Sequence, residues 1–321
     1  MNEIVGIPSY RREELLYCCL RRVREIEPFI AIHVFPDRGT ANNPLVKEIC
    51  AKFDARIHFV PEHDYYGNSY LVMEMYKWAF NEGCDLFYML EDDVFVHPDF
   101  FSWHRDQHQN FPDIFASMAW VFNRHAPLTN DLLFQPWIYS PGVAFSHNKL
   151  ALIAPHATPR YYNDMDTYIR KTFPESKLND AFNIGHCEQD GNLQRILDRD
   201  GSQTVSCGIA KCSHMGFVRS YGTGETRQHY EMFLDHTHLS FEQRVEKLES
   251  FCQDIYWRAT VFGRSIVERE VGHTLPKREL KYKVILPGGW ESEFKTEMRK
   301  DLLPSRINSV PLPSNAQIVL V

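Results

Sequence analysis

The chain has 321 residues, of which 44% are hydrophobic and 24% charged, a composition typical of a globular protein with a substantial core. The formal net charge of −7 argues against a protein that coats nucleic acid over its whole surface. No run of about 18 apolar residues occurs, so no membrane-spanning helix is predicted. The N-terminus lacks the pattern of a signal peptide, and the eight cysteines show no framework spacing. We therefore expect a cytoplasmic protein with reduced thiols.

Strand and helix patterns alternate from residue 4 to residue 90. The predicted strands are 4–7, 29–35, 56–60 and 86–90, and the predicted helices are 11–27, a segment that begins at Asn43-Pro44, and 68–83. The last of these strands is apolar at every position, as expected for a strand that helices cover on both faces. The alternation predicts an α/β fold with a mostly parallel, doubly wound sheet.

The pattern changes in the second part of the chain. We predict a helix at 98–109, strands at 114–122, 142–145 and 203–210, and a helix at 188–199 that ends before Gly201. Ser240 and Gln243 form a capping-box pattern at the start of a long helix, 240–262, whose apolar stripe should pack against the body of the protein. The segment 282–321 is rich in proline and is expected to be irregular.

Three consecutive acids, Glu91, Asp92 and Asp93, come directly after the apolar strand 86–90. Ligands of open α/β sheets bind at the carboxyl ends of the strands. Adjacent carboxylates repel one another, and a divalent cation would offset that repulsion while taking its other ligands from substrate phosphates. In the alternative interpretation one acid caps the next helix and the others are solvated.

Further polar residues follow two other predicted strands and are expected at the same edge of the sheet. Asp37 follows strand 29–35 and is either a hydrogen-bond acceptor for a nucleobase or ribose, or a turn residue. The loop after the first strand runs from Pro8 through Tyr10 to Arg11 and Arg12. Guanidinium groups suit phosphate oxygens, although a solvated helix start would also contain such arginines.

Four segments carry a resemblance to a known family. In order and spacing, IVGIPSYRR, FPDRGT, YYGNSYLVMEMYKWAF and YMLEDDVFVHPDFF resemble nucleotide-sugar-dependent glycosyltransferases of the GT-A fold. They are most similar to metal-dependent N-acetylglucosaminyltransferases, whose Asp-x-Asp motif is also Glu-Asp-Asp. The resemblance is specific over residues 3–101, looser to about residue 220, and absent after that.

The resemblance implies a Rossmann-like GT-A catalytic domain at 1–222. Its nucleotide-sugar half would be 1–101 and its acceptor half 102–222, followed by a helical and irregular extension at 223–321. It implies a divalent metal cofactor, with Mn²⁺ favoured and Mg²⁺ as the alternative, coordinated by Asp93. Glu91 and Asp92 would bind the ribose or support the metal, Asp37 would contact the base, and either Arg11 or Arg12 would meet the diphosphate.

The segment 187–196, CEQDGNLQRI, resembles the acid-rich helix start that carries the catalytic base in this family. The reaction needs one carboxylate that faces the acceptor hydroxyl and takes its proton. Asp190 is our first candidate and Glu188 the second, while Asp164 and Asp166 rank lower. The alternative interpretation is that these are ordinary acids at a helix start.

Two residues of the second half are further candidates for the donor site. His214 follows a predicted strand at a place where many GT-A enzymes have an additional metal ligand, although the N-acetylglucosaminyltransferases do not clearly share it. Gly142 fits a position where the backbone approaches the donor sugar, and it fits a strand bulge equally well.

We therefore expect an inverting glycosyltransferase that uses a nucleotide-sugar donor, with UDP favoured by the resemblance. The alternatives are a nucleotidyltransferase of sugar metabolism and a non-catalytic binding protein for nucleotide sugars or glycans. The acceptor is left open between a glycan, a small molecule and a hydroxymethylated base in viral DNA. A mildly basic stretch at 263–308, with ten Lys and Arg against seven Asp and Glu, leaves contact with DNA open.

Overall fold

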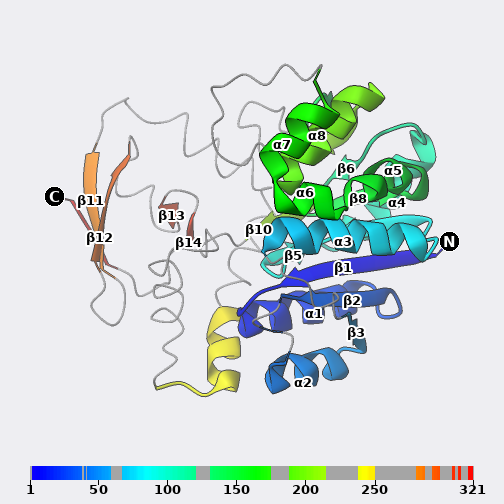
Figure 1. Cartoon of the computed structure of the whole chain (residues 1–321). Coiled ribbons are helices and arrows are strands. Elements are labelled where there is room, and N and C mark those ends of the chain that lie inside the picture. The colour runs from blue at the N-terminus through cyan, green and yellow to red at the C-terminus, as the bar shows by residue number, and fades with distance from the viewer. Residues whose placement is uncertain are drawn as a thin grey trace.

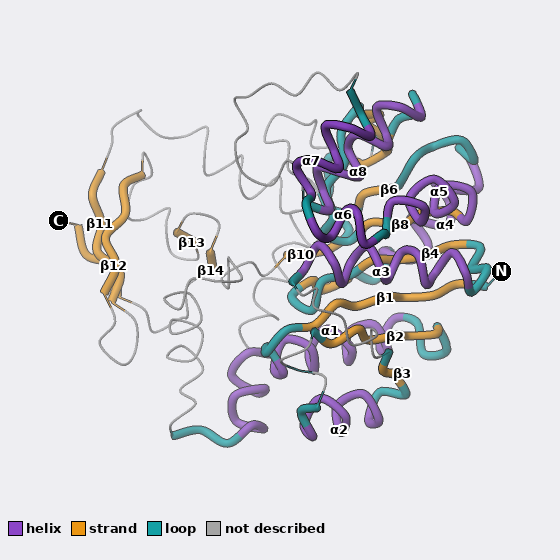
Figure 2. The backbone as a smooth tube through the Cα atoms, viewed as in Figure 1, coloured by secondary structure: helices purple, strands orange, loops and turns teal. Residues whose placement is uncertain are grey.

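A computed structural model of the chain describes residues 2–37, 40, 42–58, 67–120, 131–174, 188–214 and 238–249, and five strands between residues 280 and 320. Figure 1 shows the helices and strands of these segments, and Figure 2 shows the path of the backbone through them. No helix in this described part of the chain is both long enough and apolar enough to cross a membrane.

Helices and strands alternate along the chain. The helices are α1 (Glu13–Ile26), α2 (Pro44–Lys52), α3 (Asn68–Asn81), α4 (Phe100–Asn110), α5 (His147–Ile153), α6 (Pro159–Asn163), α7 (Met165–Thr172) and α8 (Gln189–Asp200), with a 3₁₀ turn at Ala154–His156. Residues 241–249 form a further helix. The strands are β1 (Glu3–Ser9), β2 (Ala31–Pro36), β3 (Ala55–Ile57), β4 (Leu86–Met89), β5 (Val94–Val96), β6 (Ser117–Met118), β7 (Leu132–Gln135), β8 (Val143–Ser146), β9 (Thr204–Cys207), β10 (Cys212–His214), β11 (Leu280–Ile285), β12 (Glu291–Thr296), β13 (Arg306–Ile307), β14 (Val310–Pro311) and β15 (Gln317–Leu320).

Eight strands form one sheet in the order β3-β2-β1-β4-β8-β6-β9-β7. Strands β3, β2, β1 and β4 are mutually parallel, whereas β8 and β7 run antiparallel to their neighbours. The predicted α/β fold with a mostly parallel, Rossmann-like sheet flanked by helices is therefore confirmed. Strands β2 and β3 lie on one side of β1, and after β3 the chain returns to form β4 on the other side. The topological switch point therefore lies between β1 and β4.

Helices cover both faces of this sheet (Figure 1). On one face, Leu86, Tyr88 and Leu90 pack with apolar residues of α1, α2 and α4. On the other face, Phe87 and Met89 pack with residues of α3 and α5 to α8. A strand that alternates between two apolar layers must be apolar throughout, which explains the unbroken hydrophobic run in the sequence.

Several predicted helix ends are observed with the expected hydrogen bonds. The side chain of Asn43 accepts a hydrogen bond from the backbone N–H of Leu45 at 3.0 Å and caps α2. Ser240 and Gln243 form the reciprocal capping box, since each side chain accepts a hydrogen bond from the backbone N–H of the other residue. Gly201 ends α8 with φ of 72°.

Other elements differ from the sequence expectation. The observed strand β6 covers only two residues of the predicted strand 114–122, part of which lies outside the described residues. Strand β7 and helices α5 to α7 were not predicted, nor were the strands β11 to β15, where β11 pairs with β12 and β15. The predicted helix 240–262 is described only as far as residue 249.

Candidate functional site

The candidate site lies where β1, β2 and β4 end at the same edge of the sheet. Their parallel pairing fixes this: β1 pairs along its length with β2, and its neighbour on the other side is β4. The backbone N–H of Asp37 donates to the carbonyl of Ser9 at 2.9 Å, which joins the loops that follow β2 and β1. The structure therefore brings together the three polar segments that follow these strands, at the switch point of the sheet.

A single arginine holds the two aspartates of the acid row. The guanidinium of Arg12 donates one hydrogen bond to Asp92 and another, of 2.8 Å, to Oδ2 of Asp93. The backbone N–H of Tyr10 also donates to Asp92, at 3.3 Å. All three charged side chains are buried, since Arg12 is 5% exposed, Asp92 0% and Asp93 2%. The protein itself thus supplies a counter-ion for its adjacent carboxylates.

Burial and repulsion shape the ionisation of this group. Removal from water raises the pKa of Asp92 above its ordinary value, against the opposing effect of Arg12, and the negative charge of Asp93 adds to the increase. The thiol of Cys19 lies behind the carboxylates, and burial together with the charges of Asp92 and Asp93 raises its pKa. Cys19 is therefore an inert packing residue rather than a nucleophile.

The neighbouring arginine, Arg11, has a different environment. It is exposed, and its guanidinium lies over the ring of Tyr10, 5.2 Å from the ring centre. Its φ of 50° falls in the left-handed region, which costs a non-glycine residue about 1 kcal/mol or more. The backbone N–H of Arg11 donates to Oγ1 of Thr40 at 2.9 Å, so the loop after β1 is fixed to the loop after β2.

A second carboxylate group approaches this edge from α8. The hydroxyl of Ser140, in the loop before β8, donates a hydrogen bond to Oδ1 of Asp190. Behind it, the hydroxyl of Ser69 at the start of α3 donates to Gln189 at 2.7 Å. These contacts hold the N-terminal turn of α8 against α3 and the loop before β8, which fixes the position of Asp190.

Asp190 is exposed at the surface, yet the surrounding protein withdraws its carboxylate partly from water. This desolvation raises the pKa of Asp190 to about 6; the hydrogen bond from Ser140 lowers it, and the charges of Glu91 and Glu188 raise it. Burial also raises the pKa of Tyr76, with contributions from both Asp190 and Glu91. Asp190 is therefore close enough to the acid row to sense its charge, and a carboxylate of this pKa suits proton transfer near neutral pH.

The other acids considered as bases have different surroundings. Glu188 precedes α8 and is exposed. Asp164 caps α7 by accepting a hydrogen bond of 3.0 Å from the backbone N–H of Thr167. Asp166 forms an ion pair of 2.8 Å with Arg170 one turn further along the same helix. Asp164 and Asp166 thus have structural roles at the helix start, whereas Glu188 stays the second candidate beside Asp190.

Strand β10 brings the backbone of His214 beside the acid row. It pairs antiparallel with β5, and His214 lies opposite Val94, the residue after Asp93. Only the backbone of His214 is described. Gly142 has φ of 65°, and a Cβ added there would lie 2.6 Å from Sγ of Cys212. The close packing of the β8 loop against β10 therefore accounts for this glycine, and contact of Gly142 with a donor sugar stays a prediction.

The residues at this edge fit a divalent cation that takes part of its ligands from a substrate. Among the described residues, no group of three or more His, Cys, Asp and Glu side chains is arranged to hold a metal ion. Carboxylate oxygens are nevertheless the ligands that Mn²⁺ and Mg²⁺ prefer, and such ions are often held by one or two carboxylates together with substrate phosphates. Asp93, which comes between β4 and β5 and directly before the residue that pairs with His214, stays the predicted metal ligand.

Sequence analysis did not single out Ser140, Thr40 or Tyr76. Ser140 and Thr40 act through single hydrogen bonds to Asp190 and Arg11, which are far away in the sequence. Tyr76 has the periodicity of an ordinary core residue of α3. The sequence segments that contain them, SPG for Ser140, FPDRGT for Thr40 and YYGNSYLVMEMYKWAF for Tyr76, do not indicate which residues they contact.

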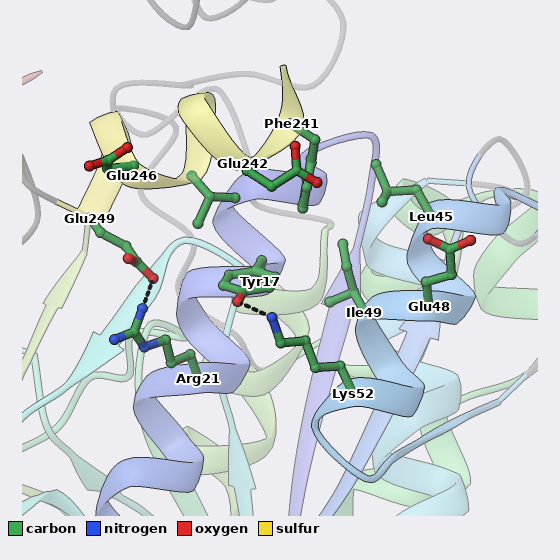
Figure 3. A pocket seen from close by; sticks show the side chains of 11 residues that line it. Tyr17, Arg21, Leu45, Glu48, Ile49, Lys52, Phe241, Glu242, Glu246 and Glu249 are labelled. Atoms are coloured by element: carbon green, nitrogen blue, oxygen red, sulfur yellow. Dashed lines mark hydrogen bonds and ion pairs between the residues drawn. The ribbon is translucent and has the colours of Figure 1, made fainter. Parts of the chain in front are cut away.

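A separate groove of about 280 Å³ lies between α1, α2 and the helix 241–249 (Figure 3). Tyr17, Leu45 and Phe241 are among its apolar lining residues. Its two cationic side chains are already engaged, since Lys52 donates to the hydroxyl of Tyr17 at 2.5 Å and Arg21 forms an ion pair of 2.6 Å with Glu249. The ion pair of Arg21 with Glu249 and the ring contact of Tyr17 with Phe241, at 5.9 Å between centroids, attach the helix 241–249 to the outer surface of α1, as the apolar stripe of that helix predicted.

Comparisons with known proteins give similarity at the level of solved structures. No protein-family profile matches the sequence, and no curated protein is similar to it. S. aureus TarS 1-349 is 12% identical with a TM-score of 0.38, over 87% of this chain and 94% of that one. Glucosyl-3-phosphoglycerate synthase from Mycobacterium tuberculosis, in complex with Mn²⁺, UDP and glucosyl-3-phosphoglycerate, is 14% identical with a TM-score of 0.34, over 46% of this chain and 57% of that one.

A nucleotidyltransferase-type structure is similar at the same level. The 4-diphosphocytidyl-2C-methyl-D-erythritol synthase of Anaerococcus prevotii is 14% identical with a TM-score of 0.37, over 64% of this chain and 86% of that one. At these low identities and TM-scores, the similarity does not indicate which reaction this chain catalyses. The fold assignment rests on the observed strand order, and the chemistry has to be argued from the residues at the edge of the sheet.

Proposed function

We propose that this chain is a metal-dependent glycosyltransferase that moves a sugar, with inversion, from a nucleotide-diphosphate sugar to an acceptor hydroxyl. One observation carries the proposal. The paired carboxylates Asp92 and Asp93 lie at the switch point of the sheet, and Asp190 on α8 is held by Ser140 in the loop that leads into β8, the strand that pairs with β4. A charged donor site beside a carboxylate base is what glycosyl transfer to a hydroxyl requires.

The donor would bind along the edge formed by β2, β1 and β4. Asp37 follows β2 and is placed for a base or ribose, and Glu91, which is partly exposed, is placed for the ribose. Arg11 is exposed at the start of α1, where helix N–H groups and a guanidinium favour phosphate oxygens. Pro8 lies near the end of β1 and leads into this loop, and Tyr10 anchors Asp92 through its backbone N–H.

Asp93, with His214 as a second ligand, would hold Mn²⁺ or Mg²⁺. When bound, such an ion neutralises the negative charge that develops on the leaving diphosphate. Asp190 would take the proton from the acceptor hydroxyl as that oxygen attacks the sugar carbon from the face opposite the diphosphate. Ser140 holds Asp190 in place and keeps its pKa from rising further.

A ligand screen tests the donor half of this proposal. Nucleotide sugars are added with and without Mn²⁺, and the melting temperature of the protein is measured, because a ligand that binds the native state stabilises it by mass action. We expect one nucleotide sugar to stabilise the protein in the presence of Mn²⁺ only. No stabilisation by any nucleotide sugar would argue against the proposal.

Mn²⁺-dependent hydrolysis of that nucleotide sugar without an acceptor is the corresponding activity assay. A glycosyltransferase releases the free sugar and a nucleoside diphosphate. A nucleotidyltransferase would instead release pyrophosphate from a nucleoside triphosphate and a sugar phosphate, and a binding protein would release neither. The acceptor classes are separated by adding glycans, small hydroxylated metabolites or DNA that contains hydroxymethylated bases, and affinity for the DNA should fall steeply with salt.

A further inference from the structure

Arg12 has an unexpected environment for an arginine in a phosphate-binding loop. Its side chain is only 6% exposed, and its two terminal nitrogens donate to two different carboxylates, Asp92 and Asp93. The fork of a guanidinium is well suited to such bridging, and the same fork would suit a diphosphate. In this structure the fork points inward to the aspartates.

The bridge competes with metal binding at Oδ2 of Asp93 and Oδ1 of Asp92, the two oxygens that Arg12 contacts. Oδ2 of Asp93 accepts the 2.8 Å hydrogen bond from Arg12, so a cation that used this oxygen would have to replace the guanidinium. Two positive charges close together in a buried site repel each other strongly, because little water screens them. Removing Arg12 without a substitute would leave two buried carboxylates uncompensated, which is equally unfavourable.

We propose that Arg12 is the resident counter-ion of Asp93 in the ligand-free protein, and that its guanidinium must leave Asp93 when a divalent cation and a nucleoside diphosphate bind together. This inference rests on the proposed function. The cation replaces the charge that Arg12 withdraws, and the diphosphate gives the guanidinium a new anionic partner. The diphosphate removes the repulsion between the guanidinium and the cation, and the cation neutralises the carboxylates that the guanidinium leaves. The two ligands therefore bind cooperatively.

The surrounding contacts allow this exchange to occur through the side chain alone. The loop backbone is fixed independently of the guanidinium, by the hydrogen bonds from the N–H of Tyr10 to Asp92 and from the N–H of Arg11 to Thr40. Asp92 keeps its contact with Tyr10 after Arg12 has left. Arg12 is the residue directly before α1, at the helix start where an incoming phosphate is favoured.

Direct binding measurements test the cooperativity without any assay of activity. Free Mn²⁺ is followed by electron paramagnetic resonance in titrations of the protein, alone and with saturating UDP, with GDP, ADP and CDP as parallel probes. For the wild-type chain we expect one of these nucleotides to increase the affinity for Mn²⁺ about tenfold or more. By reciprocity, Mn²⁺ should increase the affinity for that nucleotide by the same factor.

The variant Arg12→Gln should reduce this cooperativity. Because the competing guanidinium is gone, Mn²⁺ alone should bind several-fold more tightly than to the wild type, and the nucleotide should enhance its binding less than about threefold. The matched control is Arg21→Gln, which removes the same charge from α1, where the guanidinium pairs with Glu25 and Glu249 at the surface. The control should behave like the wild type in both titrations.

The outcomes separate this inference from the proposed function. If the wild type binds Mn²⁺ and nucleotide cooperatively and Arg12→Gln retains that cooperativity, the role of Arg12 is wrong and the proposed function stands. If the wild type binds no Mn²⁺ with any of the nucleotides, both are wrong. Should Arg12→Gln fail to fold by circular dichroism, Arg12→Lys takes its place. An ammonium carries its donors on one nitrogen and cannot reproduce the two-point contact of the planar guanidinium fork, so unchanged cooperativity in Arg12→Lys would equally overturn the inference.

Discussion

Two groups of carboxylates at one edge of the sheet keep their charge by different means. Asp92 and Asp93 are buried and depend on an internal cation, Arg12. Asp190 is exposed, and its hydrogen-bond donor among the described residues is the neutral hydroxyl of Ser140. The charges of Glu91 and Glu188 further destabilise its ionised form. Under the proposed function the first group would hold a cation, and the second would accept a proton.

The difference follows from the elements that carry the two groups. The acid row follows β4, a strand buried on both faces, so its aspartates cannot turn to solvent and must be neutralised inside the protein. Asp190 lies in the first turn of α8, at the boundary between α3 and the loop before β8, where solvent has access. Similar side chains thus acquire distinct chemistry from their surroundings.

The largest effect is expected for Asp93→Asn, because it should impair both transfer and donor binding. Transfer should fall by about 10² to 10³-fold or more, and binding of the nucleotide should no longer depend on Mn²⁺. Product formation and calorimetric titration measure the two effects. Asp99→Asn is the control, since Asp99 pairs with Lys211 at 2.7 Å outside the acid row. Mn²⁺-dependent nucleotide binding by Asp93→Asn would contradict its assignment as the metal ligand.

Asp190→Asn should impair proton transfer from the acceptor and leave the donor site at Asp92 and Asp93 unchanged. We expect kcat to fall by about 10² to 10⁴-fold while the Kd of the nucleotide with Mn²⁺ is unchanged, because a general base acts only on the acceptor. Steady-state rates and nucleotide titrations separate the two quantities. Asp198→Asn, two turns further along α8 and bonded to Gln194, is the matched control. Near-normal turnover in Asp190→Asn would show that the base is another residue.

A smaller, pH-dependent effect is expected for Ser140→Ala. Asp190 must be ionised to act as a base, so the wild-type rate should decline as the pH falls through about 6, the pKa of Asp190. Loss of the Ser140 hydrogen bond raises this pKa and moves the decline to higher pH. The variant should therefore lose more activity at pH 6 than at pH 8 in a profile of kcat/KM. An unchanged acid limb would mean that Asp190 does not control it.

The smallest effect is expected for Glu188→Gln. The charge of Glu188 raises the pKa of Asp190, so its removal should move the acid limb of the same profile slightly to lower pH. Turnover on the alkaline plateau should stay close to that of the wild type. A loss of turnover as large as that of Asp190→Asn would instead identify Glu188 as the base.

The part of the site that the sequence could predict consists of residues that closely follow a strand. Strand ends of a parallel sheet meet at one edge, so the sequence could place Arg11, Arg12, Asp37 and the acid row together before any contact was known. The sequence could not show which of the two guanidinium groups, that of Arg11 or that of Arg12, is buried. Both follow β1 directly, and only the backbone turn at Arg11, with φ of 50°, sends one guanidinium outward while the other meets Asp92 and Asp93.

The sequence by itself determined the alternation of β1 to β4 with α1 to α3, since a doubly covered strand must be apolar and an amphipathic helix must repeat every three to four residues. It also determined the capping of α2 by Asn43, because a cap is a local hydrogen bond. The tertiary structure alone decided the strand order, the pairing of Ser140 with Asp190 and the burial of Arg12 between two aspartates. These depend on contacts between residues 50 or more positions apart, and local physical chemistry does not specify such contacts.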